Sequence, residues 1–285
     1  MKIISSIIIY NGGMRKNTKL ALIYDFDKTL SPKDMQEFHY IESLGYNNPV
    51  DFWKECDKIA KDNNCDGILA YMYLMAKKNP NLTRKQLLEE GKYIKLYKGV
   101  DTWFKRVNEY GKKHHVDVEH YVISSGVTDI IKGTKIAKEF KKIYACTYVY
   151  DKDGKVLWPA RVVNYTMKTQ YLFRINKGVL AETNDEDLNK STPEELKNIP
   201  LENMVYFGDG STDVPSMKVV QQNGGTTIAV FGDDFGKKDK AVKLFEDKRA
   251  NFAVKADYRK DSKIEKIVKG IIDSLETKSK LEDYK

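Results

Sequence analysis

Apolar stretches recur along the chain and predict the buried strands of a sheet. They begin with Leu20 in LALIYDFDKTL and continue with VEHYVISSG (118–126), MVYFG (204–208), 226–232 and 250–258. The segments between them carry apolar residues at helical spacing, as in the last one, residues 263–275. Because strands alternate with helices, the sequence predicts an α/β fold whose open, mostly parallel sheet is covered on both faces.

A long segment without strand signals follows the first strand. Ser31 with Pro32 predicts a helix start there, with the serine as the cap and the proline in the first turn. Apolar residues between 35 and 44 repeat at helical spacing, and Gly45 with Pro49 is expected to end this first helix.

More helices are expected after it. Apolar residues at helical spacing predict them over 52–60 and 68–76, Thr83 with Gln86 predicts a capping box, and a helix over 101–110 is expected to lead back to the sheet. A helical insert of this size after a strand has the proportions of a cap domain. The expected division is a loose N-terminal segment 1–18, a core formed by 19–31 and 115–285, and a helical cap 32–114.

The segments between the second and third strands are more varied. Residues 128–140 continue with helical periodicity, and residues 144–163 alternate in polarity around the turn DKDG, which predicts a β-hairpin beside the main sheet. Residues 181–200 are polar and acidic, and we expect a surface loop that leads into a short helix at Pro193.

Two lysines lie at the two ends of one expected helix, TQYLFRINKG. Lys168 stands at its start, where the helix dipole disfavours a cation, so an unusual role is indicated. Lys177 stands at its end before Gly178, where a basic residue is ordinary capping. We favour Lys168 as the functional lysine and keep Lys177 as the alternative.

Composition narrows the function classes. The 285 residues are 41% hydrophobic and 32% charged, and no apolar run has the length of a membrane span. The net charge of +8 comes from lysines interleaved with acids, without the basic and aromatic stripe expected of a nucleic-acid-binding surface. Three cysteines without paired spacing favour reduced thiols and a cytoplasmic location. We therefore expect neither a nucleic acid nor a membrane as a partner.

Polar side chains collect where three of the expected strands end. Asp25 and Asp27 follow the first strand, and Ser124 and Ser125 end the second, next to a helix start that is suited to a phosphate. The carboxylates of Asp25 and Asp27 repel each other at this spacing, so both resist ionisation unless a cation lies between them or one keeps its proton.

The third strand ends in GDGSTD, where Asp209 and Asp213 stand four residues apart and can face one pocket. Carboxylates of this kind suit Mg²⁺. The sequence therefore predicts a magnesium and phosphate site at the strand ends.

Four motifs carry a resemblance to a known family. DFDKT at 25–29, ISSG at 123–126, Lys168 and GDGSTD at 208–213 resemble, in that order, the motifs of the haloacid dehalogenase-like hydrolase superfamily, particularly its phosphoserine-phosphatase-like branch. The match spans residues 20 to 275. The resemblance implies a Rossmann-like, three-layer core with a helical cap inserted after the first strand.

The resemblance also assigns roles to the first motif and to the lysine. Asp25 is expected to be the nucleophile that forms an aspartyl-phosphate, and Asp27 the general acid and base whose backbone carbonyl also helps to hold the metal. Ser124 and Lys168 are expected to bind the phosphoryl oxygens.

The remaining expected roles concern the metal and the phosphate loop. Asp209 is the expected direct Mg²⁺ ligand, and Asp213 acts directly or through water. Thr29 and Gly126 are expected to shape the phosphate loop.

The implied function is a Mg²⁺-dependent phosphatase that acts on a small phosphorylated metabolite, as a monomer or homodimer. Asp27 favours phosphomonoesters, because an alkoxide leaves poorly unless it is protonated. Phosphoserine itself is not indicated, because no arginine of the cap can be assigned to its carboxylate. The alternatives are a phosphotransferase of the same fold and a binding or regulatory protein without turnover.

Overall fold

The computed structural model describes residues 17–233, 235–282 and 284, and a seven-stranded sheet organises them. The strand order is β4-β3-β2-β1-β5-β6-β7, and all neighbours are parallel except β3 and β4. This confirms the predicted α/β class with a mostly parallel sheet. The strands are β1 Thr18–Tyr24, β2 Val116–Val127, β3 Lys142–Tyr150, β4 Val156–Arg161, β5 Met204–Gly208, β6 Thr226–Phe231 and β7 Phe252–Lys255.

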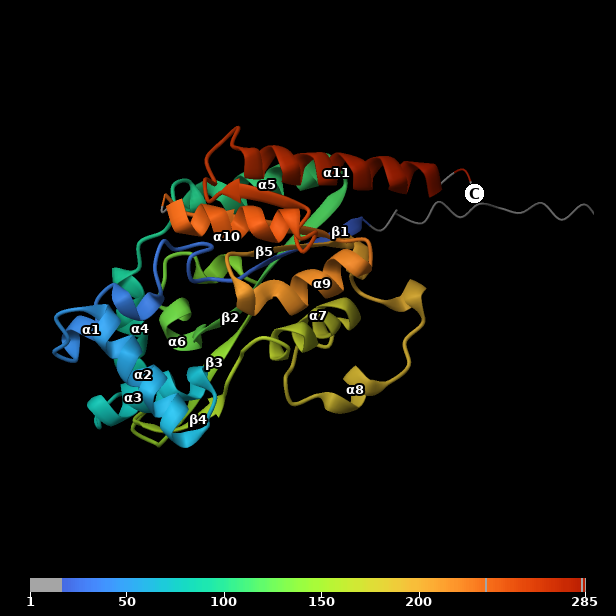
Figure 1. The fold of residues 1–285 in the computed structure, drawn as a ribbon. Helices are drawn as coiled ribbons and strands as arrows, with labels where there is room; N and C mark the ends of the chain where they lie inside the picture. Colours follow the sequence, from blue (N-terminus) through green and yellow to red (C-terminus); the bar gives the residue numbers. More distant parts are fainter. Residues whose placement is uncertain (1–16, 234, 283, 285) are drawn as a thin grey trace, which may run out of the picture.

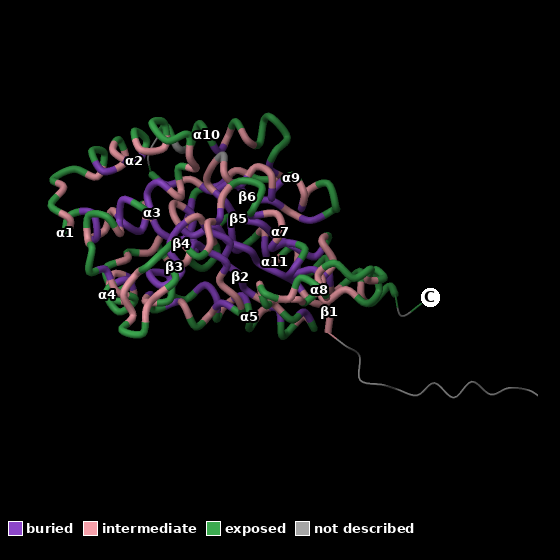
Figure 2. The backbone as a smooth tube through the Cα atoms, turned by 90° about the horizontal axis from the view of Figure 1, so that it is seen from below, coloured by how far each residue is buried: buried purple, intermediate pink, exposed green. Residues whose placement is uncertain are grey.

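Helices cover both faces of the sheet, as Figure 1 shows, with α5 and α11 on one face and α7 and α9 on the other. Figure 2 shows the buried chain concentrated in the strands between them. These layers give the sheet a dry interior on both sides. The helices are α1 Tyr40–Ser43, α2 Pro49–Asn63, α3 Gly67–Lys78, α4 Arg84–Glu90, α5 Val100–Lys113, α6 Thr128–Lys132, α7 Met167–Lys177, α8 Asp185–Asn189, α9 Val214–Gln222, α10 Phe235–Glu246 and α11 Lys263–Glu282.

Strand β1 lies at the centre of the sheet, between β2 and β5. Every side chain from Leu20 to Tyr24 is fully buried, because both faces of the strand are covered by helices. The strand ends at Tyr24, so Asp25 is the first residue beyond it. Since parallel strands end at the same edge, the residues that follow β1, β2 and β5 meet there.

The helical insert differs in detail from the prediction. The expected helix start at Ser31 is wrong: a short 3₁₀ turn, Met35–Glu37, and α1 replace one regular helix. Ser31 is buried, and its hydroxyl donates to the carbonyl of Lys33 instead of capping a helix. Pro49 begins α2 rather than ending the first helix, because the Asn48 side chain accepts a hydrogen bond from the Val50 backbone and caps the new helix.

Other local predictions for the insert are confirmed. The apolar run of residues 68–76 forms α3, and Asp66 caps it. Thr83 and Gln86 form the expected capping box of α4.

The predicted hairpin is present, but its first strand belongs to the main sheet. Strand β3 pairs with β2 in parallel, and β4 turns back along it as the edge strand. The hairpin packs against the insert, where the Tyr148 hydroxyl donates to the Met72 carbonyl and the Val156 backbone donates to the Leu82 carbonyl. The helix expected over 128–140 is shorter than predicted, since α6 ends at Lys132 and a 3₁₀ turn follows.

The end of the insert returns to the sheet as expected, since α5 packs on β2 and α11. This helix lies in the layer that covers the core, although the expected division places it within the cap. That division stays a prediction. Of the expected N-terminal segment 1–18, residues 1–16 lie outside the described residues. Within the described ranges, no helix has the length and apolar composition needed to cross a bilayer.

Candidate active site

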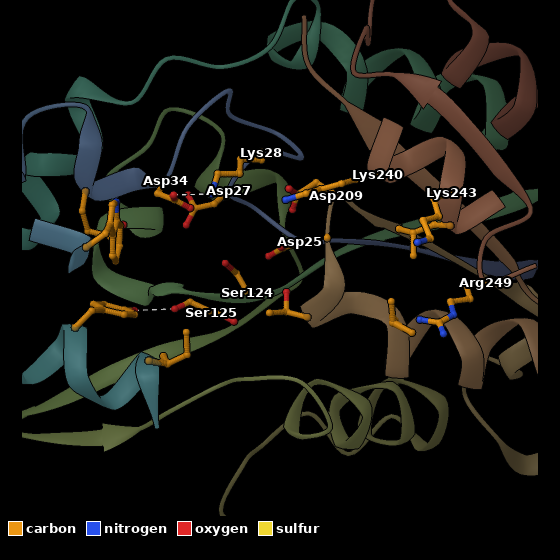
Figure 3. A pocket seen from close by; sticks show the side chains of 18 of the residues that line it. Asp25, Asp27, Lys28, Asp34, Ser124, Ser125, Asp209, Lys240, Lys243 and Arg249 are labelled. Atoms are coloured by element: carbon orange, nitrogen blue, oxygen red, sulfur yellow. Dashed lines mark hydrogen bonds and ion pairs between the residues drawn. The ribbon is translucent and has the colours of Figure 1, made fainter. Parts of the chain in front are cut away.

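A cavity of about 670 Å³ lies at the sheet edge where β1, β2 and β5 end (Figure 3). Asp25 and Asp27 from the loop after β1, Ser124 and Ser125 from β2, and Asp209 after β5 line it. The structure therefore brings the predicted acidic and hydroxyl residues together. Cavities of this size are typical of sites for small-molecule ligands.

A buried lysine lies behind the first carboxylate. The Lys168 ammonium is 3.3 Å from Asp25 Oδ1 and donates to Asp213 Oδ1 at 2.7 Å, and its side chain is completely buried. Burial lowers the pKa of Lys168, but Asp213 and Asp25 more than offset this effect, so its pKa lies above the ordinary lysine value. Lys168 therefore carries a fixed positive charge beneath Asp25.

The structure also separates the two candidate lysines. Lys177 donates to the backbone carbonyls of Leu188 in α8 and of Lys190 directly after it. Lys168, rather than Lys177, contacts the carboxylates of the site.

The two carboxylates after β1 have different surroundings. Burial raises the pKa of Asp25 to about 6, with Lys168 opposing the rise. The pKa of Asp27 is raised well above its usual range by burial and by the nearby charges of Asp34 and Asp25. Asp27 accepts a hydrogen bond from the Met35 backbone at 2.9 Å, which aligns one oxygen and leaves the other for a proton. Of the two acids, Asp27 keeps its proton more readily.

Three carboxylates form a candidate metal centre. Oxygen atoms of Asp25, Asp209 and Asp213 lie within 4.8 Å of one another. Lys168 opposes the charges of Asp25 and Asp213 at close range, and Lys28 acts on Asp209, so fully ionised carboxylates still leave an excess of negative charge. In line with this excess, burial and the charges of Asp25 and Asp213 raise the pKa of Asp209 to about 8. Hard oxygen donors with this charge fit Mg²⁺.

Two polar neighbours hold Asp213 in place. The Tyr206 hydroxyl donates to Asp213 Oδ1 at 2.9 Å, and the Gly210 backbone donates to the other oxygen. A Cβ atom on Gly208 would lie 2.5 Å from the Asp213 carboxyl carbon, so glycine is required for this close approach. The Asp27 carboxylate lies outside the metal cluster, and the resemblance assigns Asp27 to the metal through its backbone carbonyl.

The end of β2 provides a hydroxyl and a tightly packed turn. Ser124 is buried, and its hydroxyl oxygen accepts a hydrogen bond from the Gly126 backbone. A Cβ atom on Gly126 would collide with the Met35 side chain and lie 3.1 Å from Asp27 Oδ2. The Ser125 hydroxyl is buried at the cavity without a hydrogen-bond partner in the described chain, so it is available to a ligand.

Thr29 does not line the cavity. It is buried, and its backbone carbonyl accepts a hydrogen bond from the Tyr258 hydroxyl. Lys168, Asp213 and Gly126 also lie behind the residues that line the cavity rather than among them.

Several cavity residues were not predicted from the sequence. The insert contributes Gln36, Trp53, Ile68 and Tyr71, and the region of α10 contributes Lys240, Lys243 and Arg249. No local pattern marks them, because aromatic residues in helices are usually core residues and lysines are usually solvated. Tyr71 also connects the insert to the core, since its hydroxyl donates to the Ser125 carbonyl at 2.7 Å.

Comparisons with solved structures show the fold. The chain is similar to a phosphoserine phosphatase solved as a phospho-aspartyl intermediate analogue, with a TM-score of 0.52, 18% identity, and coverage of 89% of this chain and 99% of that one. It is also similar to a probable phosphoserine phosphatase from Vibrio cholerae, with a TM-score of 0.56, 15% identity, and coverage of 93% and 67% of the two chains. The chain therefore shares the fold of these two solved structures, as the resemblance implied.

Comparisons of the sequence itself are less informative. An uncharacterized protein of Borreliella burgdorferi is 27% identical over 276 residues, which cover 86% of this chain and 93% of that protein. No family model matches the sequence.

Proposed function

We propose that this protein is a Mg²⁺-dependent phosphatase that hydrolyses a small phosphomonoester through an aspartyl-phosphate on Asp25. The observation that carries the proposal is the pairing of Asp25 with the buried Lys168 at the bottom of a cavity that also holds Asp27. The positive charge of Lys168 beneath Asp25 favours its ionised form, which a nucleophile needs. The raised pKa of Asp27 favours its protonated form, which a proton donor needs.

In the first step, an Asp25 oxygen attacks phosphorus and the bond to the leaving oxygen breaks. Asp27 gives its proton to that oxygen, so the product leaves as an alcohol. In the second step, the Asp27 carboxylate takes a proton from a water molecule as that water attacks the phosphoryl group. Inorganic phosphate leaves, and Asp25 is regenerated.

The charges around Asp25 support this two-step reaction. Lys168 offsets negative charge that the phosphoryl oxygens bring to the site, and the Ser125 hydroxyl is free to donate to one of them. Asp25, Asp209 and Asp213 would hold Mg²⁺. When bound, the metal supplies positive charge that neutralises the phosphoryl group and the carboxylates around it.

Phosphate release from 4-nitrophenyl phosphate tests the proposal, with Mg²⁺ and with excess chelator. We expect turnover with Mg²⁺, loss of turnover with chelator, and a decrease of about 10³-fold or more in Asp25→Asn, because the amide is a poor nucleophile. Asp57→Asn, an exposed position on α2, is the matched control and should retain wild-type activity.

Two results would contradict the proposal. Turnover by Asp25→Asn within tenfold of wild type would exclude the covalent route, and no release from any phosphomonoester would favour a binding protein. Adding an acceptor alcohol separates hydrolysis from phosphoryl transfer, since a phosphotransferase would place the phosphoryl group on the alcohol.

A further inference from the structure

Three basic side chains stand at the mouth of the cavity, apart from the catalytic carboxylates. Lys240 and Lys243 come from α10, and Arg249 follows it, and all three residues line the cavity. Figure 3 shows Lys243 and Arg249 on the opposite side of the cavity from the insert, and Lys240 between them and Asp209 in this view. We call these three residues the basic rim. Asp247 lies beside them, so the four side chains together carry a net charge of +2.

The basic rim lacks internal partners. None of its three side chains forms a hydrogen bond or ion pair with any residue in the described part of the chain. Some exposed lysines elsewhere are paired, as Lys58 is with Asp62 at 2.7 Å and Lys278 with Glu202 at 2.7 Å. Three cations without an ion-pair partner face the cavity, and with Asp247 they give its mouth a local net charge of +2.

Uncharged side chains form much of the opposite wall of the cavity, where Asp34 is also present and is paired with Lys28. Trp53, Ile68 and Tyr71 come from the insert, and each is at least partly buried. The cavity therefore has three chemically different regions: a floor of carboxylates, a largely uncharged wall and the basic rim. The volume of about 670 Å³ is in the range of small-molecule sites, and all three regions line the same cavity.

We propose that the substrate carries a second anionic group, a phosphate or a carboxylate, which the basic rim binds while the reacting phosphate lies at Asp25. This inference rests on the proposed function, because it places the reacting phosphate at Asp25. The uncharged body of the substrate lies against the wall of Trp53 and Ile68. Lys243 and Arg249 are therefore specificity-determining residues.

A matched series of substrates tests the basic rim. Linear diols from propanediol to hexanediol, carrying one phosphate, two phosphates, or a phosphate and a carboxylate, differ only in the second group. For the wild type at the best chain length, we expect kcat/KM to be about tenfold higher for a doubly anionic compound, because each ion pair at a partly exposed site contributes about 1 kcal/mol or less. Comparing kcat/KM for the compounds with two phosphates with kcat/KM for those with a phosphate and a carboxylate shows which second anion is preferred.

Variants then show whether Lys243 and Arg249 cause the preference for doubly anionic compounds. The double variant Lys243→Gln with Arg249→Gln should bring this preference close to one, with the loss mainly in KM and with less salt dependence than wild type. Lys218→Gln, at an exposed position on α9 outside the cavity, should keep the full preference. An equal kcat/KM for singly and doubly anionic compounds in wild type would overturn the inference, as would a preference that survives in the double variant.

Calorimetric titration separates failure of this inference from failure of the proposed function. If wild type releases phosphate from no compound, the proposed function is wrong, and titration of the same compounds still measures the basic rim. Tighter binding of the doubly anionic compounds, lost in the double variant, would support the rim. Equal affinity for the singly and doubly anionic compounds would overturn it.

Discussion

Asp25 and Asp27 have the same side chain but different neighbours, and their proposed roles follow from that difference. Asp25 lies 3.3 Å from the Lys168 ammonium, which stabilises its ionised form. Asp27 lies near Asp34 and Asp25, whose charges raise its pKa together with burial. One carboxylate is thereby suited to attack phosphorus and the other to donate a proton.

A buried histidine provides a residue-scale prediction for stability. His120 lies between the Tyr24 hydroxyl and the Asn108 side chain, and Trp103 donates to the same Tyr24 oxygen. Burial lowers the pKa of His120 from 6.5 to about 3, so the folded protein keeps it neutral. Below pH 6.5 the unfolded chain binds a proton that the folded protein does not, and the free energy of unfolding should fall by about 1.4 kcal/mol per pH unit from this residue.

Urea unfolding of wild type and His120→Gln between pH 7 and pH 5 measures this contribution. This pH range includes the ordinary histidine pKa of about 6.5, at which the unfolded chain begins to bind the proton. We expect the variant to be less stable at pH 7 but to lose less stability on acidification. His115→Asn, at an exposed position, should follow the wild-type slope. Identical slopes for wild type and His120→Gln would show that His120 does not cause the acid sensitivity.

At the scale of elements, the insert is joined to the core through helices that approach closely. α4 and the turn after it pack on α6, and two glycines, Gly91 and Gly133, face each other at this contact. A Cβ atom on Gly91 would lie 2.5 Å from the Gly133 backbone and would also collide with the Ile130 carbonyl. Because backbone atoms cannot move aside as a flexible side chain can, this contact requires glycine.

We therefore expect Gly91→Ala to lower the free energy of unfolding by about 2 to 3 kcal/mol. Gly270→Ala is the control, because Gly270 lies within α11 with open space around its Cα, and alanine there should stabilise the protein by about 0.5 to 1 kcal/mol. Urea unfolding of both variants gives the comparison. A Gly91→Ala protein as stable as wild type would mean that the contact between α4 and α6 relaxes easily.

For the whole molecule, the carboxylate cluster relates metal binding to overall stability. Asp25, Asp209 and Asp213 come from segments almost 190 positions apart in the chain, as their residue numbers show, and folding holds their oxygens within 4.8 Å. An ion that binds this cluster binds the folded state and not the unfolded chain. Mg²⁺ should therefore stabilise the protein, and above the dissociation constant the gain should grow with the logarithm of its concentration.

Thermal unfolding with and without Mg²⁺ measures this effect. At a concentration about ten times the dissociation constant, the gain is about 1.4 kcal/mol, and the midpoint should rise by about 2 to 4 °C. The rise should be much smaller in Asp209→Asn and unchanged in Asp57→Asn, which is exposed and distant in sequence from the cluster. An equal rise in all three proteins would place the metal elsewhere.

The order of elements and most of the site could be predicted from the sequence. Apolar runs that end in DFD, ISSG and GDG mark three strand ends, and parallel strands place those ends at one edge of the sheet. Alternation and helical spacing are local properties, so they predict local structure such as the capping box of Thr83 and α3.

Local patterns were less reliable where long-range packing competes with them. Ser31 and Pro32 have the composition of a helix start, but Ser31 is buried and donates to a nearby carbonyl. The first strand of the predicted hairpin became part of the main sheet, because it pairs with β2. Neither outcome is encoded in the residues adjacent to these positions.

By itself, the sequence determined the strands, their ends and the acids and hydroxyls placed there, because these depend on neighbouring residues. Only the tertiary structure decided that Lys168, rather than Lys177, contacts Asp25, and that Tyr206 holds Asp213. It also decided that the basic rim of α10 faces the same cavity as the insert. These contacts join residues far apart in the chain, as in the 45 positions between Lys168 and Asp213, and packing of the helices on the sheet brings them together.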